Sequence, residues 1–130
     1  MIITFNKVNF SYSTKDIFNS ASLVINKGEF VFLVGESGTG KTTLLKLIYF
    51  DAKPKSGDVN FDDYSSVNID KSEIPFLRRK IGIVFQDFKL LNDRNIFENI
   101  AIPLYIASVK KDQIKKKVFD IAAKLGLMEY

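Results

Sequence analysis

The segment at residues 35–42, GESGTGKT, constrains the fold of this chain more than any other. It matches the pattern G-x-x-x-x-G-K-[ST], in which glycines allow a tight turn whose backbone N–H groups point inward and surround a phosphate. In such a loop the lysine places a positive charge on the β- and γ-phosphates, and the following hydroxyl ligates Mg²⁺. We therefore predict a nucleoside triphosphate site here, with Lys41 on the phosphates and Thr42 on the metal.

The segments on both sides of the loop fit this prediction. Residues 30–34, FVFLV, form an apolar run typical of a strand buried on both faces. Residues 41–50 follow the loop, with Leu44, Leu47 and Ile48 at helical spacing. A helix that begins at the loop directs its positive end toward the phosphates, which favours binding of their negative charge.

The composition excludes several other chemistries. The chain has no cysteine and no histidine, so disulfides, thiolate zinc sites, cysteine nucleophiles and a histidine general base are excluded. Any metal must bind oxygen ligands, which suits Mg²⁺. No run of 18 apolar residues is present and the first residues do not resemble a secretory signal, so we expect a globular chain without a membrane-spanning helix.

The net charge of +4 is concentrated in residues 110–124, which carry six lysines and two aspartates. Ile114, Val118, Ile121 and Leu125 recur there at helical spacing, so the segment is predicted to be one amphipathic helix. Its lysine face could bind nucleic acid or anionic lipid. The segment contains no arginine and a single aromatic residue, Phe119, which favours a simple solvated face.

The remaining elements predict an α/β fold with an added antiparallel portion. The predicted strands lie at residues 2–10, 23–25, 30–34, 59–61 and 81–85, with turns at 26–29 and 51–58 and a short helix at 76–80. Gln86 ends the second buried strand.

Together these segments resemble the nucleotide-binding domain of ABC-type ATPases, a P-loop NTPase fold. The resemblance implies that Tyr12, in Phe10-Ser11-Tyr12, stacks on the adenine ring. It also implies that Gln86 completes the Mg²⁺ shell and senses the γ-phosphate and a membrane partner. Thr42 and Gln86 are thus the expected metal ligands. The expected ATP contacts are Tyr12, Gly35, Glu36, Ser37, Gly38, Thr39, Gly40, Lys41, Thr42, Thr43 and Gln86.

Within the family, residues 85–104 are similar to the bacterial cell-division type, especially in Asp93-Arg94, with the lipoprotein-release and macrolide-export types as alternatives. The resemblance implies an ATP-binding core at residues 1–86, followed at 87–130 by the Q-loop and the start of the helical subdomain. It further implies an integral membrane partner bound through about residues 87–104, a homodimer for the complete domain, no nucleic acid, and a location on the cytoplasmic face of the membrane. The candidate partner contacts are Phe88, Leu90, Leu91 and Phe97.

The resemblance covers the whole chain, whereas the chain covers little more than half of the family's domain. The family's signature, second Mg²⁺-binding Asp, catalytic Glu and switch His have no counterpart, so we expect a partial chain with no assignable catalytic residue. We expect weak ATP binding, negligible turnover and uncovered apolar strand edges. Two alternatives stay open: another P-loop class with Asp87 as the Mg²⁺ partner, and a lysine-helix binding module.

Overall fold

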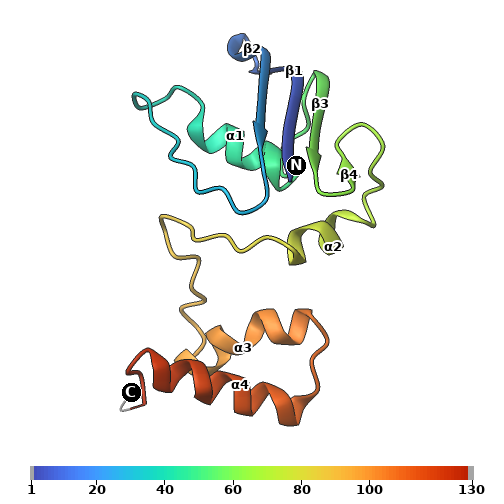
Figure 1. Cartoon of the computed structure of the whole chain (residues 1–130). Coiled ribbons are helices and arrows are strands. Elements are labelled where there is room, and N and C mark those ends of the chain that lie inside the picture. The colour runs from blue at the N-terminus through green and yellow to red at the C-terminus, as the bar shows by residue number, and fades with distance from the viewer. Residues whose placement is uncertain (1, 129–130) are drawn as a thin grey trace. The chain divides into compact units, whose positions relative to one another are not determined.

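The computed structural model describes residues 2–128, which divide into two compact units, residues 1–82 and 83–130. In chain order the first unit contains β1 (Ile3–Tyr12), β2 (Lys15–Ile25), α1 (Lys41–Ile48), β3 (Ser56–Phe61), β4 (Tyr64–Ser65) and α2 (Ile74–Arg79) (Figure 1). The second unit contains α3 (Ile96–Ile106) and α4 (Lys111–Lys124). Each unit has its own apolar core and is described separately below.

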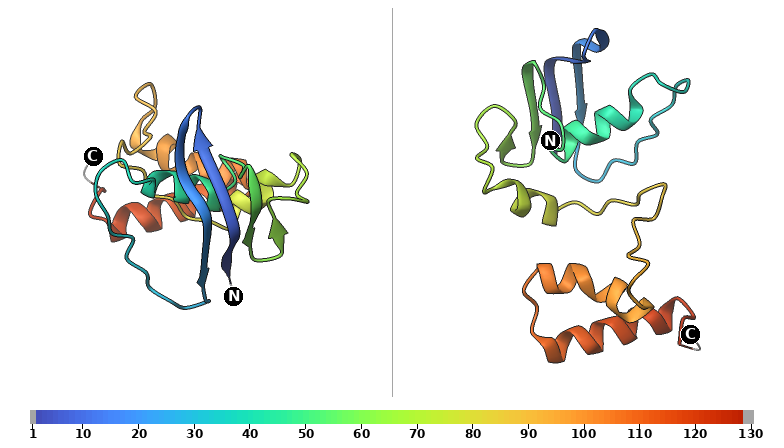
Figure 2. Two further views of the ribbon diagram at one scale, coloured as in Figure 1. Left: turned by 90° about the horizontal axis from the view of Figure 1, so that it is seen from above. Right: turned by 180° about the vertical axis from the view of Figure 1, so that it is seen from behind.

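The first unit is organised around an antiparallel sheet with the strand order β2-β1-β3-β4. β1 is central: Phe5 pairs with Leu23 of β2 on one side and with Val59 of β3 on the other. α1 lies against one face of this sheet (Figure 2). The core between the sheet and the helices consists of Phe5, Val8, Phe10, Leu47, Ile48, Phe50, Val59, Phe61 and Leu77.

A β-bulge sets which side chains of β1 enter the core. Phe5, Val8 and Phe10 are all buried, although strict alternation would put Val8 on the face opposite Phe5. The pairing shifts register between Phe5 and Val8, and Lys7 has a φ of +48° there, so the extra residue returns the apolar side chains to one face. Gly57 sits opposite this bulge, where a Cβ atom would overlap the Lys7 carbonyl oxygen.

Several predicted elements are confirmed. The strand at 2–10, the strand at 23–25, the strand at 59–61 and the helix after the loop all form, although β2 begins earlier and α1 ends earlier than the sequence indicated. The short helix α2 and the amphipathic helix α4 also form. The antiparallel portion of the predicted α/β fold is therefore present.

The two buried strands predicted at 30–34 and 81–85 are wrong for this structure. Both runs are irregular, and Phe30, Phe32 and Val34 expose 83%, 79% and 84% of their surfaces. Val84 is 96% exposed. The physical reason is pairing, because a strand forms only where a neighbour satisfies its N–H and C=O groups. Within the described residues 2–128, no backbone–backbone hydrogen bond joins residues 30–34 to any other residue. The single sheet in this range forms without them.

In the second unit α3 and α4 pack against each other around Ala101, Ile114 and Val118. α3 begins with a capping box. The Asn95 side chain accepts a hydrogen bond from the Glu98 backbone N–H at 2.8 Å, and the Glu98 carboxylate accepts one from the Asn95 N–H at 3.1 Å. These two bonds satisfy donors that a helix N-terminus would otherwise leave unpaired.

Candidate phosphate site and its family

The turn before the loop is fixed by one carboxylate. Glu29 accepts hydrogen bonds from the Asn26 side-chain amide at 2.9 Å and from the Asn26 backbone N–H at 2.7 Å. These bonds favour the ionised carboxylate, so they lower the pKa of Glu29 below its ordinary value. The turn ends β2 and directs residues 30–34 toward the loop.

The loop at 35–42 leads directly into α1. Gly40 is the N-cap residue of the helix and has a φ of +100°, a region that residues with a Cβ rarely adopt. No side chain caps this helix N-terminus. Its first N–H groups are therefore available to an anion, as they are in helices that bind phosphate.

Lys41 and Thr39 close the interior of the loop. The Lys41 ammonium donates hydrogen bonds to the carbonyl oxygens of Gly35 at 2.7 Å and Glu36 at 2.6 Å. The Thr39 hydroxyl donates to the same Glu36 carbonyl at 2.9 Å. The lysine charge thus lies within the loop itself, held by acceptors that phosphate oxygens could replace.

Contacts through β2 connect the end of the loop with the hairpin that carries Tyr12. A Cβ atom on Gly40 would lie 2.5 Å from Ile17 Cγ2 and 3.3 Å from Phe18 Cζ, so only glycine allows this approach. Phe18 pairs with Phe10, whose ring meets that of Tyr12 edge to face at 4.9 Å. Tyr12 is half exposed, as an adenine platform must be. The sequence analysis did not identify Ile17 and Phe18 as support for the loop, although this adjacent apolar pair among polar residues could have indicated it.

The predicted magnesium ligands belong to different units. The Thr42 side chain is exposed in the first turn of α1, and a hydroxyl there suits a hard cation bridged to phosphate. Gln86 is exposed in a turn of the second unit, so its pairing with Thr42 stays a prediction. Within residues 2–128 no group of three or more acidic side chains could hold a metal by itself. The residues present fit a cation that phosphate oxygens and the Thr42 hydroxyl share.

Asp87 is engaged within its own turn. Its carboxylate lies 2.6 Å from the Lys89 ammonium, and the hydrogen bond from Lys89 lowers the pKa of Asp87. Phe88 and Lys89 both have positive φ, so the turn is tight. The Asp87 carboxylate is therefore already paired with Lys89. This pairing does not favour the alternative prediction that Asp87 is the Mg²⁺ partner.

Asn99 organises the segment before α3, a role that the sequence analysis missed. Its amide oxygen accepts a hydrogen bond from the Leu91 N–H, and its amide nitrogen donates to the carbonyls of Leu91, Arg94 and Asn95 at 3.0–3.1 Å. One side chain thereby holds residues 91–95 against the start of the helix. A polar residue next to the Asn95–Glu98 capping pattern was the available signal.

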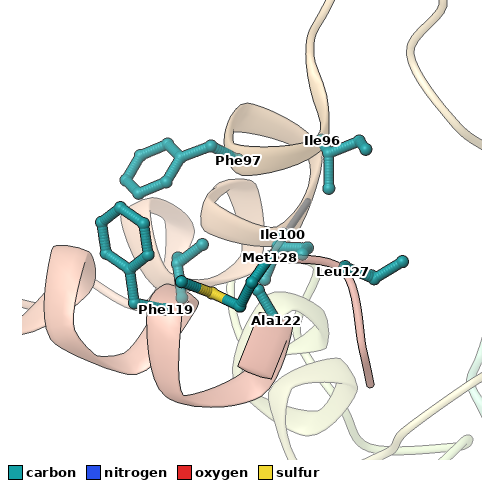
Figure 3. Close-up of a pocket in the computed structure, with 8 residues that line it drawn as sticks. Ile96, Phe97, Ile100, Phe119, Ala122, Leu127 and Met128 are labelled. Carbon is teal, nitrogen blue, oxygen red and sulfur yellow. The ribbon is translucent and has the colours of Figure 1, made fainter. Parts of the chain in front are cut away.

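The second unit also contains an apolar recess between α3 and α4, shown in Figure 3. The rings of Phe97 and Phe119 meet there with centroids 6.0 Å apart, and Met128 lines the same recess. None of the predicted ATP or Mg²⁺ ligands lines this recess. Phe97, proposed from sequence as a partner contact, packs here instead of pointing freely into solvent.

With this geometry in place, comparison with known proteins decides the family. The sequence model for ABC transporter proteins matches residues 18–130. The chain belongs to the ABC transporter family. The residues matched by the family model include the loop at 35–42, whereas Tyr12 lies before the first matched residue.

Among curated relatives, the ABC chain is 46% identical over 103 residues to the cell division ATP-binding protein FtsE of Bacillus subtilis, covering 79% of this chain and 45% of the relative. It is 39% identical over 129 residues to FtsE of Escherichia coli K12, covering 98% and 58%. The chain therefore spans about half the length of these relatives.

Solved structures agree with the ABC assignment. The post-hydrolysis dimer of the ATP-binding cassette MJ0796, bound to ADP and Pi, has a TM-score of 0.79 at 29% identity, covering 92% of this chain and 55% of its own. CbiO1 from Clostridium perfringens, part of the complex CbiONQ, has a TM-score of 0.80 at 27% identity, covering 98% and 51%. The predicted ABC fold class is confirmed.

Proposed function

We propose that the chain binds ATP with Mg²⁺ and forms part of the ATP-binding subunit of a cell-division-type ABC complex. The observation that carries the proposal is Lys41, whose ammonium lies inside the glycine loop at the uncapped N-terminus of α1. The similarity to two FtsE proteins supports the cell-division type.

Each predicted contact has a chemical role in this proposal. Backbone N–H groups of residues 35–42 surround the phosphates, and Lys41 neutralises their charge. Thr42 ligates Mg²⁺, with Gln86 as the second protein ligand. Tyr12 stacks on the adenine, which contributes about 1–3 kcal/mol for such a contact.

Binding without turnover is the expected behaviour of residues 1–130 alone. Phosphoryl transfer depends on positioning and on stabilising charge around an in-line water. We assign no residue of this chain to polarise that water. The MJ0796 cassette was solved as a dimer with ADP and Pi, and we propose that the complete domain likewise acts as a dimer.

The membrane partner is proposed to contact residues 87–104. Phe88, Leu90 and Leu91 expose 76%, 64% and 47% of their surfaces, as a docking surface requires. Asn99 and the capping box hold this segment in place. No helix among residues 2–128 is long and apolar enough to cross a bilayer. The proposed peripheral location at the cytoplasmic face rests on the family resemblance alone.

Titration with a fluorescent ATP analogue and Mg²⁺ tests the proposal. The unmodified chain should show saturable binding that Lys41→Ala abolishes. Lys46→Ala removes a lysine from the same helix away from the loop and should bind as the unmodified chain does. Equal binding by Lys41→Ala would disprove the phosphate role of Lys41, and measurable turnover that depends on Lys41 would disprove the inactivity of the isolated chain.

Another ABC subunit type is the second candidate. The chain is 37% identical to the methionine import ATP-binding protein MetN 2 of Bacillus cereus, over 97% of this chain and 38% of that protein. Co-purification of the full-length protein with a cell-division membrane subunit, compared with an importer subunit, distinguishes the two types. Loss of cell-division binding in a Phe88→Ser, Leu90→Ser variant would support the proposed docking segment.

A further inference from the structure

The positive charge of α4 is not neutralised by ion pairs within the described part of the chain. All six lysines of residues 110–124 are exposed, and none of the ion pairs among residues 2–128 involves them. Ile114, Val118 and Ala122 of the same helix are buried. The unpaired positive charge is therefore available to an external anionic surface.

Three of the lysines form a row along the helix. Lys117 and Lys124 lie in α4 and Lys110 is its N-cap residue. The three are seven residues apart, and positions with this spacing drift by only about 20° per step around an α-helix. We call these three residues the lysine row. The other three, Lys111, Lys115 and Lys116, lie elsewhere around the helix, so the row can be tested separately from total charge.

Aliphatic side chains border the row on one side. At about 100° per residue, Ile121 and Leu125 lie roughly 40–80° from the row. They expose 41% and 65% of their surfaces. A row of lysines beside exposed aliphatic groups is the arrangement of helices that lie in a membrane interface, where the charges meet headgroups and the apolar groups enter the acyl boundary.

We propose that the lysine row and its aliphatic neighbours bind directly to an anionic lipid surface. Nucleic acid fits the helix less well, because residues 110–124 contain no arginine and no aromatic side chain borders the row. The single aromatic residue of α4, Phe119, packs toward Phe97 in the apolar recess. This lipid contact does not depend on the ATP site, and it adds a second attachment to the proposed protein partner.

Co-sedimentation with vesicles tests the proposal. The full chain should bind phosphatidylglycerol vesicles and not phosphatidylcholine vesicles, and rising salt should weaken the binding. Neutralising the row in K110Q/K117Q/K124Q should weaken binding by about 100-fold, given the usual contribution of each lysine near an anionic surface. The matched control K111Q/K115Q/K116Q makes the same change in net charge and should retain most of the binding.

Two further variants separate the sources of affinity. I121S/L125S should lose the binding that persists at high salt, because that part comes from aliphatic insertion. Lys41→Ala should bind vesicles like the unmodified chain, so failure of the ATP proposal and failure of this one are distinguishable. Circular dichroism of each variant establishes that α4 is retained.

Three outcomes would overturn the proposal. Equal losses in the row variant and the control would show a diffuse charge effect. Binding to a DNA or RNA duplex without binding to vesicles would assign the face to nucleic acid. Absence of binding to both vesicles and nucleic acid would show that the lysines only form a solvent-exposed face of the helix.

Discussion

The Lys41 ammonium lies 2.6 Å from the Glu36 carbonyl oxygen, so the loop residue expected to hold phosphate is held by the loop itself. The second acceptor, the Gly35 carbonyl, lies 2.7 Å away. A compact ammonium group donates both bonds. Phosphate binding at this site must exchange carbonyl acceptors for phosphate oxygens, which makes the size and shape of the cation important.

Lys41→Arg should weaken ATP binding by about tenfold or more, although it keeps the charge, because a planar guanidinium does not replace a compact ammonium in a closed loop. Titration with the fluorescent analogue measures the effect. Lys46→Arg, in the same helix, is the control and should bind normally. Full binding by Lys41→Arg would show that charge alone suffices at this position.

Gly40→Ala should destabilise the first unit by more than about 2 kcal/mol, because positive φ and steric overlap both oppose a Cβ atom. The overlap is with Ile17 Cγ2, 2.5 Å from the added atom. Urea denaturation followed by circular dichroism measures the free energy of unfolding.

Gly28→Ala is the matched control for this variant. Gly28 has a φ of +84° but nothing within 4 Å of an added Cβ, so it should show the smaller conformational cost alone. Adding Ile17→Ala to Gly40→Ala should recover part of the loss by removing the overlapping methyl group. Equal destabilisation at Gly28 and Gly40 would contradict the role of Ile17.

How much could be predicted from sequence depended on whether local or distant residues decide the conformation. The turn of the loop was predictable because the positive φ of Gly40 and the hydrogen bonds of Lys41 to Gly35 and Glu36 all lie within residues 35–42. The strand at 30–34 was not, because its apolar pattern indicates burial but does not supply the neighbouring strands that burial requires. The chain spans about half the length of its FtsE relatives, and residues 2–128 contain no pairing partner for that run.

Two smaller misses have different causes. The bulge at Lys7 depends on close approach to Gly57, which lies about 50 residues away in sequence, so alternation in β1 alone could not reveal it. The capping box at Asn95 and Glu98 was readable in the sequence and would have placed the start of α3. The box marks where the segment with exposed apolar side chains ends and α3 begins.

Asn99→Ala should loosen residues 91–95 without unfolding α3, because it removes hydrogen bonds to four backbone groups outside the helix core. Faster hydrogen exchange at the Leu91 and Arg94 amides is the expected result. Gln113→Ala, an exposed polar change in α4, should leave these amides unaffected. Unchanged exchange at Leu91 in Asn99→Ala would mean that the backbone holds the segment without help.

The Asp87–Lys89 ion pair predicts a pH-dependent turn after Gln86. The hydrogen bond from Lys89 lowers the pKa of Asp87 from its ordinary value of 3.8, so the folded turn favours the ionised carboxylate. A lowered pKa means that the contribution to the turn is present above pH 3.8 and is lost as the pH falls through the folded-state value. NMR titration of the Asp87 carboxyl carbon should therefore give a midpoint below 3.8, and Lys89→Met should return it toward 3.8.

Lys80→Met, which removes a different ion pair with Asp62, is the control and should leave the Asp87 midpoint unchanged. An unshifted midpoint in the unmodified chain would show that the turn does not hold this pair in solution.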